Sequence, residues 1–280
     1  FLYNIGLYAY PAFADKPVYD KSGYNLFCPV PDNKLREMST DRPDKTEGPF
    51  TIDAGHYQIE FDMATYTYHK DKRDNTRTNS YTVFAPNLRV GLLHNLELDL
   101  ILSSFNSVRT KDDTTGITTK NQGFGDTLVR LKYNFWGNEG KGKTALGIIP
   151  FIKVPTNQGG LGNRSYDGGI LLPLDIELTD KLGLGVMTGV EYNRGDNVGK
   201  HVFNFINSAS FGYDFTEKFG SFVEFYTERS NEPGSRWIIT ADFGATYALT
   251  DNWQIDAGAY VGLTPAADDI TPFIGMSLRF

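Results

Sequence analysis

The stretch TPFIGMSLRF, residues 271–280, decides the fold. Successive side chains of an extended chain point to opposite faces, so this stretch has one apolar face and one small or polar face. The apolar face carries Ile274, Met276, Leu278 and Phe280, and the other carries Gly275, Ser277 and Arg279. A period of two with a single apolar face predicts a half-buried β-strand.

The same alternation recurs from Ala54 onward, in runs separated by turns. Near the end of the chain, for example, Ile255 and Val261 share one face while Gln254 and Asp256 share the other. The pattern predicts about twelve strands. Their expected positions are 55–69, 80–92, 95–107, 123–136, 144–155, 168–179, 182–194, 202–215, 219–230, 236–249, 253–264 and 271–280.

The expected connections alternate between short and long. Short turns fall at 93–94, 137–142, 180–181, 216–218 and 251–252, and longer polar loops fall at 70–79, 108–122, 156–167, 195–201, 230–235 and 265–270. Aromatic residues gather near strand ends on the apolar face, where they suit the headgroup level of a bilayer. They are Tyr133, Phe135, Trp136, Tyr213, Phe215, Trp237 and Trp253. These features predict an all-β fold: a transmembrane, antiparallel, up-and-down β-barrel of the Gram-negative outer membrane.

The composition argues against several other classes of protein. The chain has 34 acidic and 27 basic residues, so its formal charge of −7 offers no electrostatic basis for binding nucleic acid. No stretch reaches the roughly 18 consecutive apolar residues that a membrane-spanning helix needs. The single Cys28 cannot form an internal disulfide, and no metal-ligand spacing or cofactor motif occurs. We therefore expect no metal and no cofactor.

The sequence divides into three parts. Residues 1–14 end in Ala12-Phe13-Ala14, a pattern typical of signal-peptide cleavage, and we expect either the remnant of a secretory signal or an N-terminal extension. Residues 15–53 are rich in proline and lack periodicity, whereas residues 54–280 carry the repeated strand pattern of the barrel.

The last predicted strand also resembles the terminal signal that the barrel-assembly machinery reads in outer-membrane proteins. Gly275, Leu278 and Phe280 match that signal. Phe273 departs from it, because a polar residue is usual two positions before the glycine. The resemblance implies that the assembly machinery is a partner during biogenesis.

A second resemblance covers most of the chain. The stretches 39–50 and 53–60, then 123–126 with 130–133, then 143–146 with 150–155, resemble the MetA-pathway phenol-degradation family of outer-membrane proteins. The resemblance implies an outer-membrane barrel that takes up small molecules, aromatic compounds among them. It does not imply an enzymatic activity.

If Phe280 and its apolar row face lipid, alternation assigns a set of charged side chains to the lumen. They are Glu60, Asp62, Arg89, Glu97, Asp99, Asp126, Arg130, Lys132, Lys153, Glu191, Glu224, Asp242, Asp256 and Arg279. Opposed charges across a lumen can orient polar solutes and so give selectivity. The alternative is a structural role, in which buried acids and bases simply pair with each other.

Residues 15–53 precede the first strand on the short-turn, periplasmic side. Lys34, Arg36, Arg42 and Lys45 in this segment are candidates to pair with the inward carboxylates. We therefore predict that the segment folds into or against the lumen as a plug or constriction. The alternative is a flexible periplasmic arm.

The function predicted from the sequence is a channel or transporter for passive passage of small molecules, which include aromatic or hydrophobic compounds. The alternative is a non-conducting structural or accessory barrel of a cell-envelope complex. The expected partners are outer-membrane lipid, a small-molecule solute and, for the alternative, other envelope proteins. An enzyme is not expected, because His56, His69, His94 and His201 are assigned to the rims and none stands in a catalytic motif.

Overall fold

A computed structural model describes residues 19–140, 142–195 and 198–280. Its elements are η1 (Asp32–Lys34), β1 (Tyr57–Asp71), β2 (Thr76–Leu93), β3 (Leu96–Ile101), β4 (Phe105–Asp112), β5 (Thr118–Gly123), β6 (Thr127–Trp136), β7 (Thr144–Val154), β8 (Asp167–Thr179), β9 (Leu182–Arg194), β10 (His201–Asp214), β11 (Phe219–Ser230), β12 (Ile238–Thr250), β13 (Trp253–Gly262) and β14 (Ile270–Arg279). No helix in these described ranges is long and apolar enough to cross a membrane.

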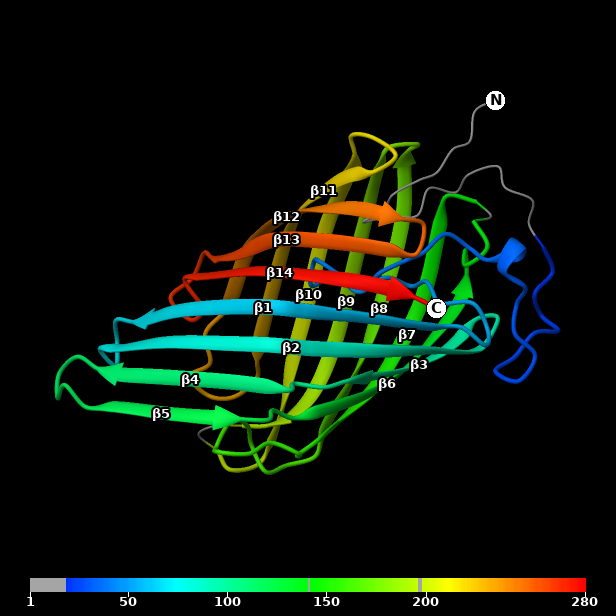
Figure 1. The fold of residues 1–280 in the computed structure, drawn as a ribbon. Coiled ribbons are helices and arrows are strands. Elements are labelled where there is room, and N and C mark those ends of the chain that lie inside the picture. Colours follow the sequence, from blue (N-terminus) through cyan, green and yellow to red (C-terminus); the bar gives the residue numbers. More distant parts are fainter. Residues whose placement is uncertain (1–18, 141, 196–197) are drawn as a thin grey trace.

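The strands form one closed antiparallel barrel, as Figure 1 shows. Twelve strands make the wall, in the order β1, β2, β3 and β6 to β14, and β14 returns to pair with β1. Closure joins Gln58 to Arg279 and Ile59 to Leu278. The predicted fold class, an antiparallel barrel of about twelve strands, is confirmed. The two additional strands are β4 and β5.

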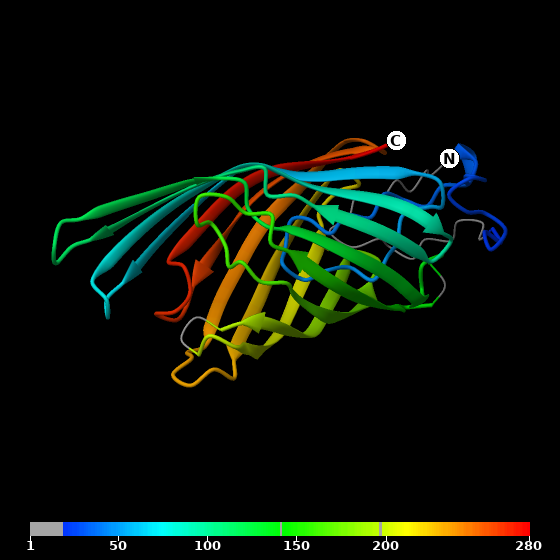
Figure 2. The same cartoon turned by 90° about the horizontal axis from the view of Figure 1, so that it is seen from below.

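The predicted strand 95–107 and the predicted loop 108–122 are both wrong in detail. The strand breaks after Ile101 and resumes as β4, and the expected loop is the hairpin of β4 and β5. The long strand β2 pairs with β3 through residues 87–93 and with β4 through residues 76–83. In Figure 2 the hairpin projects beyond the other long loops. Its polar sequence gave no apolar alternation because few of its side chains lie at the level of the lipid chains.

The break belongs to a line of irregularities across neighbouring strands. The pairing of β1 with β14 shifts between Asp62 and Ala64, and Phe84 of β2 has a φ of 53°, which is rare for a bulky residue. Residues 124–126 likewise separate β5 from β6. Four adjacent stretches of the sheet therefore bend at about the same level.

The wall alternates between lipid-facing and lumen-facing side chains. On β14, Ile274 is 47% exposed, while its neighbours Phe273 and Ser277 are buried. All of the aromatic residues that the sequence assigns to the headgroup level are exposed: Tyr133, Phe135, Trp136, Tyr213, Phe215, Trp237 and Trp253. An apolar outer face on a closed barrel is the surface that a bilayer requires.

The segment that precedes β1 enters the barrel from the end where the short turns lie. Figure 2 shows it as a blue loop surrounded by the strands. Val30, Phe50, Ile52 and Ala54 of this segment are all buried. At its outer end the amide of Leu26 donates to the carbonyl of Leu92, so the segment is also tied to the rim.

Candidate lumen site formed by the barrel and its N-terminal segment

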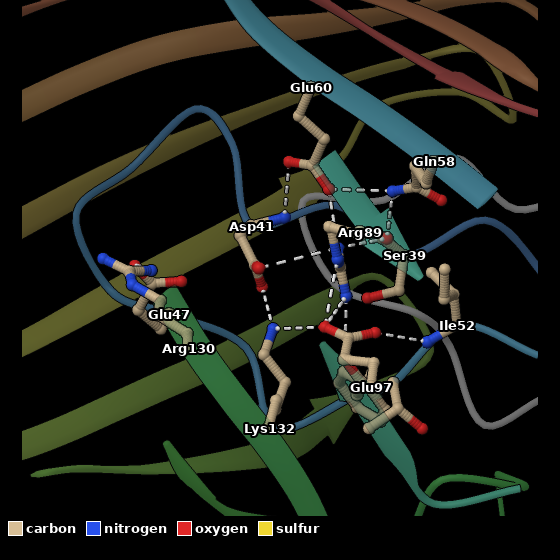
Figure 3. Close-up of polar contacts among 12 residues, drawn as sticks. Ser39, Asp41, Glu47, Ile52, Gln58, Glu60, Arg89, Glu97, Arg130 and Lys132 are labelled. Carbon is tan, nitrogen blue, oxygen red and sulfur yellow. Dashed lines mark hydrogen bonds and ion pairs between the residues drawn. The ribbon is translucent and has the colours of Figure 1, made fainter. Parts of the chain in front are cut away.

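A buried cluster of charges lies on the inner wall formed by β1, β2, β3 and β6, and Figure 3 shows its contacts. Arg89 of β2 donates to Glu60 of β1 at 2.6 Å and to Glu97 of β3 at 2.7 Å. Lys132 of β6 lies 3.4 Å from the same Glu97. The strand register places these side chains together, because Glu97 pairs with both Gly91 and Lys132.

The cluster also holds both arms of the N-terminal segment. Glu60 accepts hydrogen bonds from the backbone amides of Asp41 and Arg42, at 3.0 and 3.2 Å. Glu97 accepts one from the amide of Ile52 at 2.7 Å. Arg89 in turn donates to the carbonyl oxygens of Ser39 and Phe50. Backbone groups of the segment, which would be costly to bury without partners, are therefore satisfied by charged wall residues.

Asp41 brings a further carboxylate into this cluster. It contacts Lys132 at 2.5 Å and lies 3.6 Å from Arg89. Burial alone would raise the pKa of Asp41, but the nearby Arg89 and Lys132 lower it below its ordinary value. The carboxylates of Asp41, Glu97 and Asp99 lie close enough together to suggest a metal site. Arg89 and Lys132 already supply the positive charge there, which makes the arrangement an ion-pair cluster.

The tip of the segment contacts the neighbouring part of the wall, formed by β13, β14 and β1. Arg42 donates to Asp256 of β13 at 2.7 Å and to Asp62 of β1 at 2.7 Å. Burial lowers the pKa of Arg42, but Asp256 and Asp62 outweigh it and raise that pKa above its ordinary value. A Cβ at position 275 would lie 2.5 Å from Cζ of Arg42, so Gly275 leaves the space that this guanidinium occupies.

The residues after Arg42 make further contacts with β10, β11 and β12. The amine of Lys45 lies 3.1 Å from Asp242 and over the rings of Tyr226 and Tyr260, at 4.7 and 4.4 Å. The hydroxyl of Thr46 donates to Glu224 at 2.5 Å. It also lies 2.7 Å from the hydroxyl of Ser208. On the other side of the tip, Glu47 pairs with Arg130 at 2.5 Å.

The predicted cations of the segment therefore have different surroundings. Arg42 and Lys45 contact inward carboxylates of the barrel strands. Arg36 instead pairs with Asp53, which lies within the segment, at 3.0 Å, and with Glu139 of a short turn at 3.4 Å. Lys34 approaches the hydroxyl of Tyr24 and the ring of Tyr19, outside the charged cluster.

The remaining predicted lumen residues lie outside the contacts of the segment's tip. Lys153 pairs with Asp126 and Asp167 near the long loops, both at 2.9 Å. Asp126 lies in the break before β6, not on a strand as predicted. Glu191 accepts from Asn193, and Arg279 donates to Asn252 and to the carbonyl of Arg36. Asp99 is fully buried, and neither of its carboxylate oxygens has a hydrogen-bond partner in the described part of the chain.

The inner wall formed by β7 to β10 contains an apolar cluster, which we did not predict. Ile149, Leu171, Met187 and Ile206 form a buried cluster, against which Phe151 and Tyr226 pack. The signal was present in the nearly unbroken apolar run 145–152, where both faces of one strand are apolar. A run of this kind predicts a strand with two apolar faces, one toward lipid and one toward the lumen.

A polar cavity of about 510 Å³ lies at the long-loop end of the barrel. Its lining includes Asn204, Glu228 and Ser230 from β10 and β11, and Arg73 and Arg236 from the loops. Glu228 accepts hydrogen bonds from Asn204 and from Tyr226. Because Tyr226 also contacts Lys45, the floor of this cavity adjoins the tip of the N-terminal segment.

Ser165, His201 and Asp167 also come together near this end. The Ser165 hydroxyl lies 3.1 Å from Nε2 of His201, and the Asp167 carboxylate lies 3.2 Å from the same nitrogen. In a catalytic triad the serine and the acid contact different nitrogens of the imidazole. This grouping therefore lacks the geometry of a proton relay, and it ties a loop to β10.

The comparisons with known proteins agree with this architecture. The family described as "Putative MetA-pathway of phenol degradation" matches residues 40–280. The COG4313 outer membrane channel from Pseudomonas putida F1 is similar in structure, with 13% identity and a TM-score of 0.57 over 86% of this chain and 98% of that one. The NanC porin is also similar, with 10% identity and a TM-score of 0.52 over 79% and 100% of the two chains. No curated protein sequence matches the chain.

At these identities the two solved structures establish the fold, which is that of an outer-membrane barrel. The family match begins at Thr40, inside the N-terminal segment, and continues through every strand. The chain belongs to the MetA-pathway phenol-degradation family of outer-membrane β-barrel proteins.

Proposed function

We propose that the protein is an outer-membrane channel for passive passage of small molecules, and that residues 39–53 act as its plug. The observation that supports this proposal is the set of contacts between the segment and the lumen wall. Arg42 pairs with Asp256, Lys45 with Asp242 and Glu47 with Arg130, so the segment crosses the interior and contacts several sides of it. A solute must then pass around the plug or wait until it moves.

The apolar cluster on the inner wall supports an aromatic or hydrophobic solute. Ile149, Leu171, Met187 and Ile206 are buried, and they would offer an aromatic ring an apolar surface once the groups that cover them move aside. The inward charges that flank this wall would orient the polar end of such a solute. The phenol-degradation description of the family points to the same class of compound.

The alternative is an accessory barrel of a cell-envelope complex that conducts little. The observation that favours it is the set of ion pairs between the segment and the wall, because each pair must be broken before the segment can leave. Breaking a buried pair by removing one partner costs about 3–5 kcal/mol, which would make spontaneous opening rare.

A reversible disulfide between the plug and the wall distinguishes the two functions. The hydroxyls of Thr46 and Ser208 lie 2.7 Å apart, so Thr46→Cys with Ser208→Cys is well placed to form one, in a background that carries Cys28→Ser. We expect the oxidised variant to pass a small phenol across liposomes at least tenfold more slowly than the reduced form. The reduced form should match the Cys28→Ser parent.

The two single-cysteine variants serve as controls, since oxidant should leave their flux unchanged. Equal flux in the locked and reduced forms would contradict the plug. An absence of both solute flux and bilayer conductance in every form, including the reduced one, would contradict the channel and support the accessory barrel.

A further inference from the structure

The outer face of the sheet near the long loops carries a band of basic residues, which we call the basic face. It consists of Lys70 of β1, Arg77 of β2, Arg109 and Lys111 of β4, and Lys120 of β5. The register brings them side by side: Lys70 pairs with Arg77, Arg77 with Lys111, and Arg109 with Lys120. The basic face therefore spans four adjacent strands.

These side chains point away from the lumen. The residues between them point inward: Thr67 contacts Thr271 of β14, and Thr82 donates to Asn106 across the sheet. Tyr81, which alternates with these inward residues and so points outward, is 53% exposed. The basic residues share this orientation, so they stand on the side that faces the lipid and the space above it.

The outward side chains change in character along these strands. The row nearest the bilayer centre contains Ala64, Val83 and Phe105, which pair with one another. The next row contains Tyr66 and Tyr81, and the rows beyond contain the basic face. From Ala64 to Lys70 the distance along the strand is about 20 Å, at roughly 3.3 Å per residue. This order, apolar then tyrosine then cation, follows the order of acyl chain, interface and headgroup.

The charge of this face is opposite to that of the whole chain. The chain carries a formal charge of −7, yet five cations stand on the basic face. Asp113 of the hairpin turn pairs with Arg77 at 2.5 Å and lies 3.8 Å from Lys111. Within the described residues, neither Arg109 nor Lys120 forms an ion pair with an acid, so the basic face keeps a clear positive excess.

We propose that the basic face binds the phosphate groups of an anionic lipid in the outer leaflet, of the chemistry of phosphorylated lipid A. Phosphate monoesters offer charged acceptors for which Arg and Lys are the natural donors. The acyl chains of the same lipid would lie against Val83 and Phe105, directly below. Continuity with the lipid-facing surface is the reason to choose a lipid over a soluble anion, because a soluble anion would have no use for the apolar row.

Native mass spectrometry of the barrel in detergent micelles tests this proposal, with bisphosphorylated lipid A as the probe. The variant combines Arg109→Gln, Lys111→Gln and Lys120→Gln. Each cation near an anionic surface contributes about fivefold to affinity, so we expect a loss on the order of 100-fold. Lipid A without phosphates should bind the unsubstituted protein as weakly as the bisphosphorylated form binds the variant.

A matched variant removes the same charge from the opposite rim, through Lys143→Gln, Lys181→Gln and Lys218→Gln, which are all exposed. We expect it to retain lipid A. A conservative variant, Arg109→Lys with Lys120→Arg, should retain it as well, and heat-modifiable migration on gels checks that each barrel is folded. Equal binding by the unsubstituted protein and the Gln variant of the basic face would overturn the proposal, as would an equal loss in the matched variant. Displacement of the lipid by millimolar inorganic phosphate would show a soluble-anion site in its place.

Discussion

The two sides of the lumen bury their side chains by opposite means. The wall of β1, β2, β3 and β6 carries Glu60, Arg89, Glu97 and Lys132, all essentially inaccessible to solvent. The wall of β7 to β10 carries Ile149, Leu171, Met187 and Ile206, which are equally buried. A buried charge demands a partner at a fixed place, whereas a buried methyl group accepts any apolar neighbour. The charged side therefore fixes its part of the N-terminal segment through specific contacts, whereas the buried apolar cluster can repack around a different apolar group.

The largest expected effect comes from the charged wall. Arg89→Ala leaves Glu60 and Glu97 buried without their shared cation, so we expect a loss of about 3–5 kcal/mol in the free energy of unfolding. Urea unfolding in micelles, followed by tryptophan fluorescence, measures it. The exposed Arg109→Ala is the control and should change stability by less than about 0.5 kcal/mol.

On the apolar wall, Leu171→Ala should cost somewhat less, about 2–3 kcal/mol, because the neighbours can partly close the cavity. The adjacent Leu172 is 41% exposed and faces outward, so Leu172→Ala should cost about 1 kcal/mol, since a lipid chain can fill the space. The same urea titration applies. A larger loss for Leu171→Ala than for Arg89→Ala would break the distinction between the two walls.

The smallest expected effect is a pH dependence of the contacts that Asp53 makes with Lys21 and Arg36, which anchor the N-terminal segment at the short-turn end of the barrel. Asp53 accepts from Lys21 at 3.0 Å and from the amide of Arg36 at 2.7 Å. Burial alone would raise the pKa of Asp53, but Arg36 and Lys21 outweigh it and lower that pKa below its ordinary value. A lowered pKa in the folded state stabilises the anchor above the unfolded value of about 3.9, and this contribution is lost as pH falls through the folded pKa.

Amide hydrogen exchange of residues 36–53 should therefore accelerate only below about pH 4. In Asp53→Asn the exchange should already be fast at neutral pH and should lack this acid transition. An unchanged transition in Asp53→Asn would assign it to another carboxylate.

Much of the barrel could be predicted from the sequence, because alternation reports directly on which side chains face lipid. The prediction of strands failed where the side chains of a strand do not face lipid, because such a strand has no apolar alternation. Residues 118–123 form β5, yet they are polar on both faces because they face neither the acyl chains of the bilayer nor a packed core. The break after Ile101 was equally hidden, because it depends on how the long strand β2 is shared by two partners.

The sequence predicted which charged residues face the lumen, but it did not predict which of them form ion pairs with each other. Alternation placed Glu60, Arg89 and Glu97 inside, and the structure brings these three together. Sequence alone could not distinguish Arg42, which pairs with Asp256, from Arg36, which pairs with Asp53. The ion-pair partner of each residue depends on how deep that residue lies in the lumen, and this depth is set by the closed barrel as a whole.

The contacts of Arg42 have a consequence for the order of folding. Arg42 lies near the start of the chain and its partner Asp256 near the end, 214 positions later. Lys45 and Glu224 are 179 positions apart. Contacts of such long sequence separation form late, because the intervening chain must first be arranged. The segment that precedes β1 thus reaches its final position only when β14 has paired with β1 and closed the barrel.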